Sequence, residues 1–388
     1  MKRQLSFLGK ARQDPRTGYR KARYRLDDGR EIEGAFFGLS LAREEHPDEL
    51  CLLGTPGSMW DVMLEEQGEP LATEEQRLAL IEAVAASAVT DQLLAPFEAG
   101  LSAVTGLRCR LRVTGYARDA REQAGLLHDM SDGLAPGDII TLDVTHGLRH
   151  LPMLALAAGH YLERVKGVQV SAIVYGAAEL QEGGVVPVVN LGGLLRVLDW
   201  VQALSAYDAS GNYGVFGPLL EDAGVAGAGA RLAGAGFEER ITRHNEARNR
   251  LNGLDLAAAG DDAFAALFLP ELLERTGWWK LDGRWRREAA LARQYLDRED
   301  YLRATIYAQE ALISRGLPDR DAQEFDLREE RRIALKDGPT RARILFYLRN
   351  ELAHGVTSRN PHPDVRSMMR SADSLRAGLR DLLDELLG

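Results

Sequence analysis

Arg349, Asn350 and His354 are the residues of this chain whose types and spacing best suit chemistry. A histidine can move protons near neutral pH. An arginine can bind the charge that builds up on a phosphate while a ribose 2′-hydroxyl attacks it. This set contains no acidic metal ligand, so we expect metal-free cleavage of a phosphodiester to be the reaction that it suits.

A structural explanation of the same residues is also open. Cationic side chains near the end of a helix complement the negative end of its dipole. A lone arginine and histidine on a helix are more often explained in this way, so the motif by itself does not decide between the two.

The segment around these residues is predicted to be a helix. Apolar residues recur with the spacing of one buried helical face, at Ile344, Leu345, Leu348 and Leu352. Pro339 lies near the expected start, and Gly355 directly follows His354. Asn350 and His354 are four residues apart and share a face, whereas Arg349 points about 100° away from Asn350.

The composition is that of an ordinary globular protein of 388 residues, with 45% hydrophobic and 27% charged residues. No apolar run is long enough to cross a membrane, and no signal peptide is apparent. The two cysteines, Cys51 and Cys109, lie in apolar runs, which predicts reduced, buried thiols and a cytoplasmic protein. A net charge of −10 argues against nonspecific coating of nucleic acid but leaves room for a local basic groove.

The N-terminal half alternates short apolar runs with amphipathic segments. This alternation predicts a parallel, doubly wound, Rossmann-like sheet with helices on both faces. We expect strands over 4–8, 49–53, 107–114, 138–144, 168–175 and 183–189, and helices over 73–87, 119–130, 145–163 and 191–207.

Small and hydroxyl residues follow several of these strands, as Gly9-Lys10, 54–58, 143–147 and 175–176. Such loops let backbone N–H groups approach a phosphate, and the carboxyl ends of parallel strands meet at one edge of a sheet. Neither a GxGxxG nor a GxxxxGK[ST] motif is present. Together the loops predict a nucleotide-like pocket.

The C-terminal half is predicted to be mostly helical, with helices over 288–316 and 367–387 and a charged, helix-like stretch over 238–250. The Ala/Gly-rich stretch 223–236 is either a flexible connector or a close-packed helix end. Trp278, Trp279 and Trp285 lie among basic residues; packing is the favoured interpretation, and stacking on RNA bases is the alternative. The basic residues of 328–336 either extend a basic surface or form a solvated face.

With both halves in view, the chain resembles the CARF–HEPN ribonucleases of type III CRISPR systems. The N-terminal resemblance rests on Leu8-Gly9, on Leu53-Gly54-Thr55 followed by Ser58-Met59-Trp60-Asp61, and on Asp143-Val144-Thr145-His146-Gly147-Leu148-Arg149. The C-terminal resemblance rests on Arg349-Asn350-Glu351-Leu352-Ala353-His354, which matches the R-N-x-x-x-H pattern of active HEPN nucleases. The stretch from about 207 to 287 matches nothing in the family.

The resemblance implies a CARF sensor over 1–205, a connecting helical region over 206–287 and a HEPN nuclease domain over 288–388. It implies a homodimer or a higher homo-oligomer whose sensor domains bind a cyclic oligoadenylate, commonly the tetra- or hexa-adenylate, with the tetra-adenylate expected here. That activator would switch on cleavage of single-stranded RNA without a metal or another cofactor. The catalytic residues would be Arg349, Asn350 and His354, and those near the activator would be Gly9, Lys10, Thr55, Ser58, Met59, Thr145, His146, Gly147 and Arg149.

Some roles stay open within this resemblance. His146 is either a ligand contact or a structural residue at a helix start. Trp60 is expected in the core, and Asp143 is expected to order its loop because a carboxylate facing phosphates would repel them. The alternative function is a regulator that binds cyclic oligoadenylate and whose helical half serves only in dimerisation.

Overall fold

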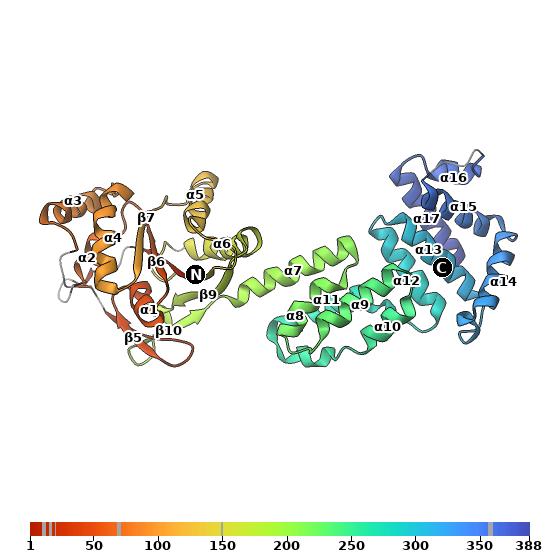
Figure 1. Ribbon diagram of the computed structural model, residues 1–388, viewed down its shortest axis with the longest axis horizontal. Helices are drawn as coiled ribbons and strands as arrows, with labels where there is room; N and C mark the ends of the chain where they lie inside the picture. Colours follow the sequence, from red (N-terminus) through yellow and green to blue (C-terminus); the bar gives the residue numbers. More distant parts are fainter. Residues whose placement is uncertain (10–12, 15–17, 20, 68–70, 149, 356–359) are drawn as a thin grey trace. The chain divides into compact units, whose positions relative to one another are not determined.

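The structure is a computed structural model that describes residues 1–388 apart from 10–12, 15–17, 20, 68–70, 149 and 356–359 (Figure 1). The chain divides into two compact units, Met1–Leu198 and Asp199–Gly388. The first unit contains the sheet, and the second is built from helices. The domain boundaries expected after residues 205 and 287 remain predictions.

Five parallel strands form the centre of the first unit. In space they follow the order β7-β6-β1-β8-β9, which is the 3-2-1-4-5 order of Rossmann folds. Their bounds are Lys2–Leu8 (β1), Glu49–Gly54 (β6), Arg108–Val113 (β7), Ile139–Asp143 (β8) and Gln169–Gly176 (β9). The predicted Rossmann-like core is therefore present.

The sheet as a whole is mixed, whereas the sequence predicted a parallel sheet. In the described residues three more strands extend it beyond β9, in the order β10 (Val185–Asn190), β4 (Ala22–Arg25) and β5 (Glu31–Gly34). β10 is antiparallel to β9 because only residues 177–184 connect them, which is too short for a helical crossover. A separate two-stranded sheet pairs β2 (Gln13–Asp14) with β3 (Gly18–Tyr19).

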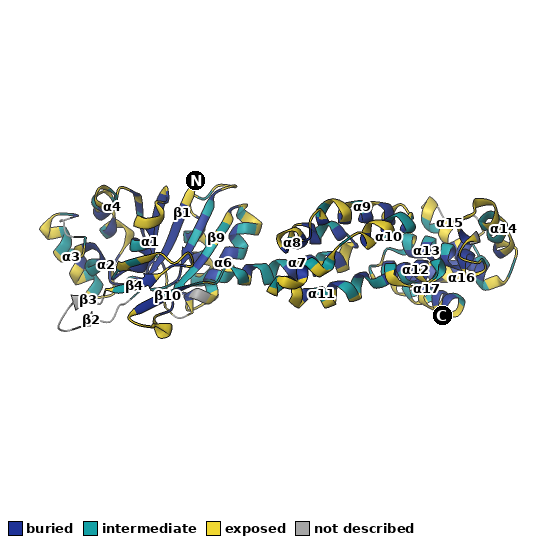
Figure 2. Cartoon of the chain, turned by 90° about the horizontal axis from the view of Figure 1, so that it is seen from below, coloured by how far each residue is buried: buried dark blue, intermediate teal, exposed yellow. Residues whose placement is uncertain are grey.

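The two faces of the sheet carry separate hydrophobic cores, as the dark strands between helices in Figure 2 show. Alternate residues of β6 enter opposite cores: Leu50 and Leu52 face one side, and Cys51 and Leu53 face the other. The first core includes residues of α1 (Phe37–Glu45), α2 (Trp60–Glu65), α3 (Glu74–Ala85) and α4 (Asp91–Thr105); the second includes residues of α5 (Ala120–Ser131), α6 (Leu151–Lys166) and α7 (Gly193–Ser210). Trp60 is fully buried, as expected.

Helix α6 begins at Leu151, although the sequence predicted a helix from Thr145. Thr145, His146, Gly147 and Leu148 precede the helix in a loop at the end of β1, and a proline near the start of α6 suits the first turn of a helix. These four residues thus lie on a loop rather than on the helix, and Asp143 ends strand β8.

The second unit contains ten further α-helices in its described residues. They are α8 (Gly217–Asp222), α9 (Ala228–Arg240), α10 (His244–Asn252), α11 (Ala263–Thr276), α12 (Arg284–Asp297), α13 (Tyr301–Arg315), α14 (Phe325–Lys336), α15 (Thr340–His354), α16 (Pro363–Met368) and α17 (Ala372–Leu387). None of the described helices combines the length and hydrophobicity that crossing a bilayer requires.

Three helical predictions needed correction in this unit. The long helix expected over 288–316 is interrupted between α12 and α13, where Glu299 has a φ of 59° and Asp300 caps α13. The helix-like stretch expected over 238–250 is divided at Thr242, which has a φ of 65°. The last helix was predicted to begin at residue 367, but α17 begins after Ser371, which caps it with a capping box. The Ala/Gly-rich stretch is largely helix α9, and a Cβ at Gly217 would lie 2.7 Å from the Cα of Gly229, so close packing explains its composition.

Three loops meet at the carboxyl end of β1 because residue 9 has no side chain. A Cβ at Gly9 would lie 1.7 Å from the carbonyl oxygen of His146, in the loop after β8. The carbonyl of Gly9 accepts a hydrogen bond of 3.1 Å from the backbone N–H of Met59, in the loop after β6. Gly9 therefore permits the close approach of the loop after β8 and forms a hydrogen bond with the loop after β6.

We predict that Gly9→Ala lowers the free energy of unfolding by about 1–3 kcal/mol, because the methyl group can be accommodated only by moving backbone. Urea denaturation would measure the loss. Gly125→Ala is the matched control, since a Cβ there meets no atom within 4 Å and alanine favours the α5 helix. Equal stability of the two variants would contradict the steric argument.

Candidate functional site

A pocket of about 430 Å³ lies at the carboxyl ends of the parallel strands, around the junction of β1 and β8. The strand order reverses at this junction, and ligands of open α/β sheets bind at such a point. The predicted residues that line the pocket are Gly9, Thr55, Ser58, Thr145, His146 and Gly147. Met59 is buried beside them rather than in the lining. Lys10 and Arg149 lie outside the described residues.

The turn after β6 is fixed by Ser58, which is 1% exposed. Its Oγ donates to the carbonyl of Leu8 at 2.6 Å and accepts from the N–H of Thr55 at 2.8 Å. The indole of Trp60 donates to the carbonyl of Thr55 at 3.0 Å. The hydroxyl of Ser58 thus holds the loop after β6 against the end of β1 and shapes the pocket.

The loop after β8 is ordered by Asp143, as expected from the sequence. Asp143 is fully buried, and its Oδ1 accepts from the N–H of Thr145 at 2.9 Å. The Oγ1 of Thr145 accepts from the N–H of Gly176 at 2.9 Å, which joins this loop to the end of β9. Burial raises the pKa of the Asp143 carboxyl to about 6.

His146 connects the pocket to helix α1. Its Nε2 accepts a hydrogen bond of 3.0 Å from the N–H of Phe37, the first residue of α1. Protein surrounds most of the imidazole, and this desolvation lowers its pKa to about 4. The ring is therefore neutral at pH 7 with its hydrogen on Nδ1, so His146 lines the pocket and has a structural role at the same time.

Sequence reasoning missed the contribution of the loop after β7. Thr114 and Tyr116 also line the pocket, and Tyr116 adds a phenol ring to its lining. The backbone carbonyl of Tyr116 lies 2.9 Å from Nε2 of His150. This loop could have been predicted from the sequence, because the carboxyl ends of all parallel strands meet at one edge of a sheet. Gly115, directly after the predicted strand, indicated the turn.

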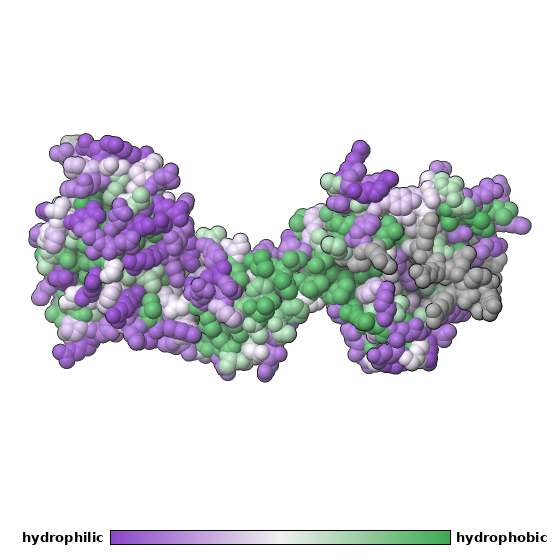
Figure 3. Space-filling view, turned by 180° about the vertical axis from the view of Figure 1, so that it is seen from behind, coloured by the Kyte–Doolittle hydropathy of each residue, from purple (hydrophilic) through white to green (hydrophobic). Residues whose placement is uncertain are grey.

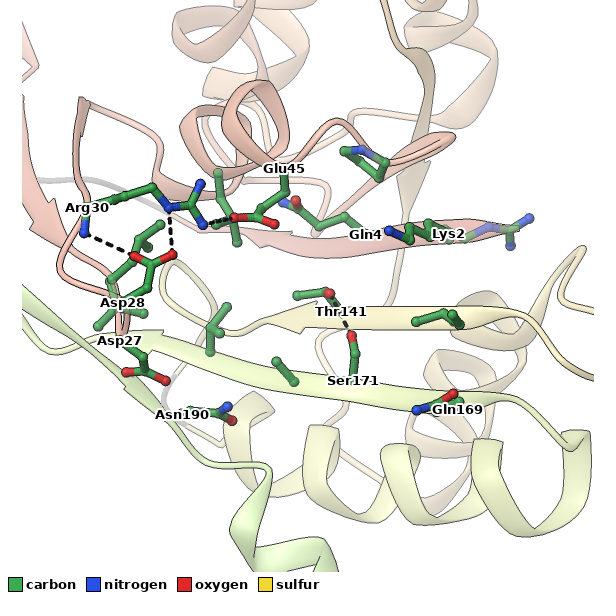
Figure 4. Close-up of a pocket in the computed structure, with 18 residues that line it drawn as sticks. Lys2, Gln4, Asp27, Asp28, Arg30, Glu45, Thr141, Gln169, Ser171 and Asn190 are labelled. Carbon is green, nitrogen blue, oxygen red and sulfur yellow. Dashed lines mark hydrogen bonds and ion pairs between the residues drawn. The ribbon is translucent and has the colours of Figure 1, made fainter.

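A second cavity, of about 520 Å³, lies at the opposite edge of the sheet (Figure 4). Its lining includes the first residues of the parallel strands, Lys2, Ile139 and Gln169, and also Asn190 at the end of the antiparallel strand β10. Arg30 is held there by Asp28 at 2.6 Å and Glu45 at 2.6 Å. Because these carboxylates would repel a phosphate, we favour the pocket at the carboxyl edge for an anionic ligand.

In the second unit, Arg349, Asn350 and His354 lie near the end of helix α15, which spans Thr340–His354 as the sequence indicated. All three side chains are exposed, and Nη1 of Arg349 donates to Oδ1 of Asn350 at 3.2 Å. The predicted apolar face is confirmed at Ile344, Leu345 and Leu348, which are buried, whereas Leu352 is only half-buried. Packing of one face thus presents the three polar side chains to solvent.

The tryptophans divide between core and surface. Trp278 is buried, and its indole donates to the hydroxyl of Tyr213 at 2.5 Å, so the packing interpretation holds for this residue. Trp285 is half-buried, with the guanidinium groups of Arg286 and Arg315 at 5.0 and 5.1 Å from its ring centre.

Both cysteines are buried free thiols. Within the described part of the chain, no cluster of three or more side chains has the composition of a metal site.

We predict that His146 makes the free energy of unfolding decrease as the pH falls from about 6.5 to about 4. In this range the unfolded chain protonates the histidine, whereas the folded protein does not, because its pKa is lowered. Asp143 acts in the opposite direction, since its raised pKa favours folding as the pH falls below about 6.

The difference in unfolding free energy between the wild type and His146→Gln isolates the histidine, because Asp143 and the other groups titrate in both proteins. Glutamine retains an oxygen that can accept from Phe37. Urea titrations at several pH values should show this difference shrinking by roughly 2–3 kcal/mol between pH 7 and pH 4. A difference that is independent of pH would contradict a neutral, desolvated imidazole.

Comparison with known proteins links the chain to CRISPR systems. No protein-family model matches it. It is similar to the CRISPR-associated protein MJ1674 of Methanocaldococcus jannaschii, with 25% identity over 225 residues. The match covers 53% of this chain and 35% of that relative. This similarity supports a CRISPR-related role for the chain.

Proposed function

We propose that the protein is an endoribonuclease that a cyclic oligoadenylate activates and that cleaves single-stranded RNA without a metal. The observation that carries the proposal is the exposed group of Arg349, Asn350 and His354 on helix α15, in a chain whose other unit has a pocket at the switch point of a Rossmann-like sheet. The similarity to a CRISPR-associated protein adds independent support.

Among the residues that the structure describes, the pocket suits the phosphates of the activator through its backbone. Its loops bring together Gly9 and Gly147, which have no side chain that could cover the backbone. Successive backbone N–H groups in such loops bind anions. A cyclic oligoadenylate repeats one chemical unit around a ring, so two copies of the same pocket related by a two-fold axis would match it.

Exposed apolar side chains in the second unit support a homo-oligomer. Helices α7 and α11 are adjacent there, because the rings of Trp200 and Phe268 stack at 5.6 Å. Val201 and Leu267 on these helices are 52% and 63% exposed, and Figure 3 shows hydrophobic surface over this region. Apolar surface of this kind commonly marks a subunit contact.

The three polar groups of α15 have distinct roles in the proposed reaction. The imidazole of His354 takes the proton from the ribose 2′-hydroxyl or delivers one to the leaving 5′-oxygen. The guanidinium of Arg349 binds the charge that develops on the phosphate. The amide of Asn350 bonds Arg349 and fixes its orientation. A dimer would double this set, so two chains could share the acid and base roles.

The alternative is a regulator that binds the same activator but does not cleave RNA. The exposed apolar residues of the second unit would then serve only in assembly. In that case Arg349 and His354 would only complement the dipole at the end of α15. We favour the nuclease because it gives a role to all three exposed polar groups of this helix end.

We predict that the purified protein degrades single-stranded RNA in EDTA only when a cyclic oligoadenylate is present. The chemistry rests on side chains, so chelation should leave the rate unchanged. A gel assay with a panel of ring sizes would measure it, with linear oligoadenylates as the control for ring recognition. Absence of cleavage with every ring size would leave only the regulator.

We also predict that His354→Ala lowers the cleavage rate by about 10²–10⁴-fold, because the proton-transfer group is removed. Binding of the activator, measured by calorimetry, should stay unchanged because the pocket residues lie in the first unit. His128→Ala is the control for removal of a histidine elsewhere. Normal cleavage by His354→Ala would exclude the assigned site.

A further inference from the structure

A stacked pair of aromatic rings lies on the same helix as the proposed catalytic group. The rings of Tyr347 on α15 and His362 are 5.9 Å apart between centroids and inclined by 21°. This is the geometry of an offset stack. Tyr347 is 40% exposed, and the His362 side chain is 29% exposed, so the pair belongs to the surface.

The pair lies on the face of α15 that carries Asn350 and His354. Tyr347 precedes Asn350 by three residues and His354 by seven, and positions spaced in this way share one face of a helix. At a rise of about 1.5 Å per residue, the ring lies roughly 4.5 Å from the level of Asn350 and roughly 10 Å from that of His354 along the axis. Arg349 flanks the same end of the helix.

His362 is held in place by its own segment. Pro361 and Pro363 flank it, which restricts the backbone on both sides. It caps α16, where its Nδ1 accepts from the N–H of Asp364 at 3.3 Å.

Helix α16 is itself anchored. Val365 and Met368 are buried, and a Cβ at Gly378 on α17 would lie 2.6 Å from Cγ of Met368. The stacked pair is therefore preorganised, which reduces the entropy lost when a ligand binds.

The segment of sequence that contains the pair is basic, whereas the chain as a whole is acidic; within this segment Arg341 pairs with Glu385 on α17 at 2.6 Å. Residues 340–370 contain six arginines and two acidic residues, a net charge of +4, whereas the whole chain carries −10. A polyanion would be attracted to this part of the second unit. An exposed aromatic stack within a cationic segment is the combination that binds single-stranded nucleic acid, because every base has a π-face.

We propose that Tyr347 and His362 form a stacking platform for a base of the RNA substrate, next to the phosphodiester that is cleaved. This inference rests on the proposed ribonuclease function. One base lies against the exposed tyrosine ring, and its ribose and phosphate then reach Asn350, Arg349 and His354 along the helix face. The platform is indifferent to base identity but requires a base to be present.

The alternative role for the pair is structural, with the stack only attaching α16 to α15. The two roles differ in how they respond to the substrate. A structural role makes the effect of a Tyr347 substitution independent of the RNA, whereas a stacking role makes it depend on a base at one position.

The experiment uses an oligonucleotide with a single ribonucleotide in a deoxyribose background, so that only one 2′-hydroxyl can attack. The base is removed in turn from the ribonucleotide and from each neighbour, and KM and kcat are measured with the activated full-length protein. For the wild type we expect one abasic substrate to have a KM raised roughly 5- to 150-fold, the range for losing one stacked base.

In Tyr347→Leu the intact and abasic substrates should have the same KM within about twofold. Tyr347→Phe, which keeps the ring, should retain the abasic penalty. Phe325→Leu removes another exposed aromatic ring, 77% exposed on α14, and should also retain the penalty. A penalty that persists in Tyr347→Leu would overturn the platform.

A second measurement separates this inference from the nuclease proposal. Two proteins are compared, the His354→Ala variant and the same variant with Tyr347→Leu added. Each is titrated with intact and with abasic RNA in the presence of the cyclic oligoadenylates, and fluorescence anisotropy measures RNA binding. If the wild type cleaves no RNA but binding still requires both Tyr347 and the base, the nuclease proposal fails and the platform stands. If binding is the same with or without Tyr347 or the base, the platform fails.

Discussion

The close approach of Gly9 to the carbonyl of His146 is the constraint on which the candidate ligand site depends. With hydrogen in place of a side chain, the loop after β1 can lie under the loop after β8 while its carbonyl bonds the loop after β6. Ser58 and Asp143 then hold these two loops from inside the protein. The pocket is thus formed mainly by backbone packing, which explains why its lining has few charged side chains among the described residues.

Much of this arrangement could be predicted from the sequence. The alternation of short apolar runs with amphipathic segments predicted the Rossmann-like core, and the positions of Gly9, Thr55 and Thr145 after strands predicted that they would meet at one edge. The helix that carries Arg349 and His354 was marked by its apolar period and by Pro339 and Gly355. These features are local or follow from a general rule of sheet topology, so one sequence is enough to find them.

Other features were not predicted, because the pattern of apolar residues alone does not carry them. The antiparallel direction of β10 follows from the length of its connection, whereas its apolar run looks the same in either direction. The break between α12 and α13 lies in a helix-like pattern and depends on the left-handed backbone of Glu299. His146 both lines the pocket and accepts a hydrogen bond from Phe37. The sequence offered these two roles only as alternatives, because Phe37 is distant from His146 in the sequence.

The β4–β5 hairpin ties the outer edge of the sheet to the pocket. Strands β4 and β5 are antiparallel, and the chain continues from β5 into α1. Phe37, the first residue of α1, donates its N–H to His146. In the described sheet β5 is the terminal strand, so it pairs with another strand on one side only. Local fraying of such a strand needs less energy than opening of a central strand. Fraying of β5 can reach the His146 contact through a small hydrophobic cluster, because Ile32 of β5 packs against it and the ring centre of Phe37 lies 4.7 Å from that of Tyr24 in it.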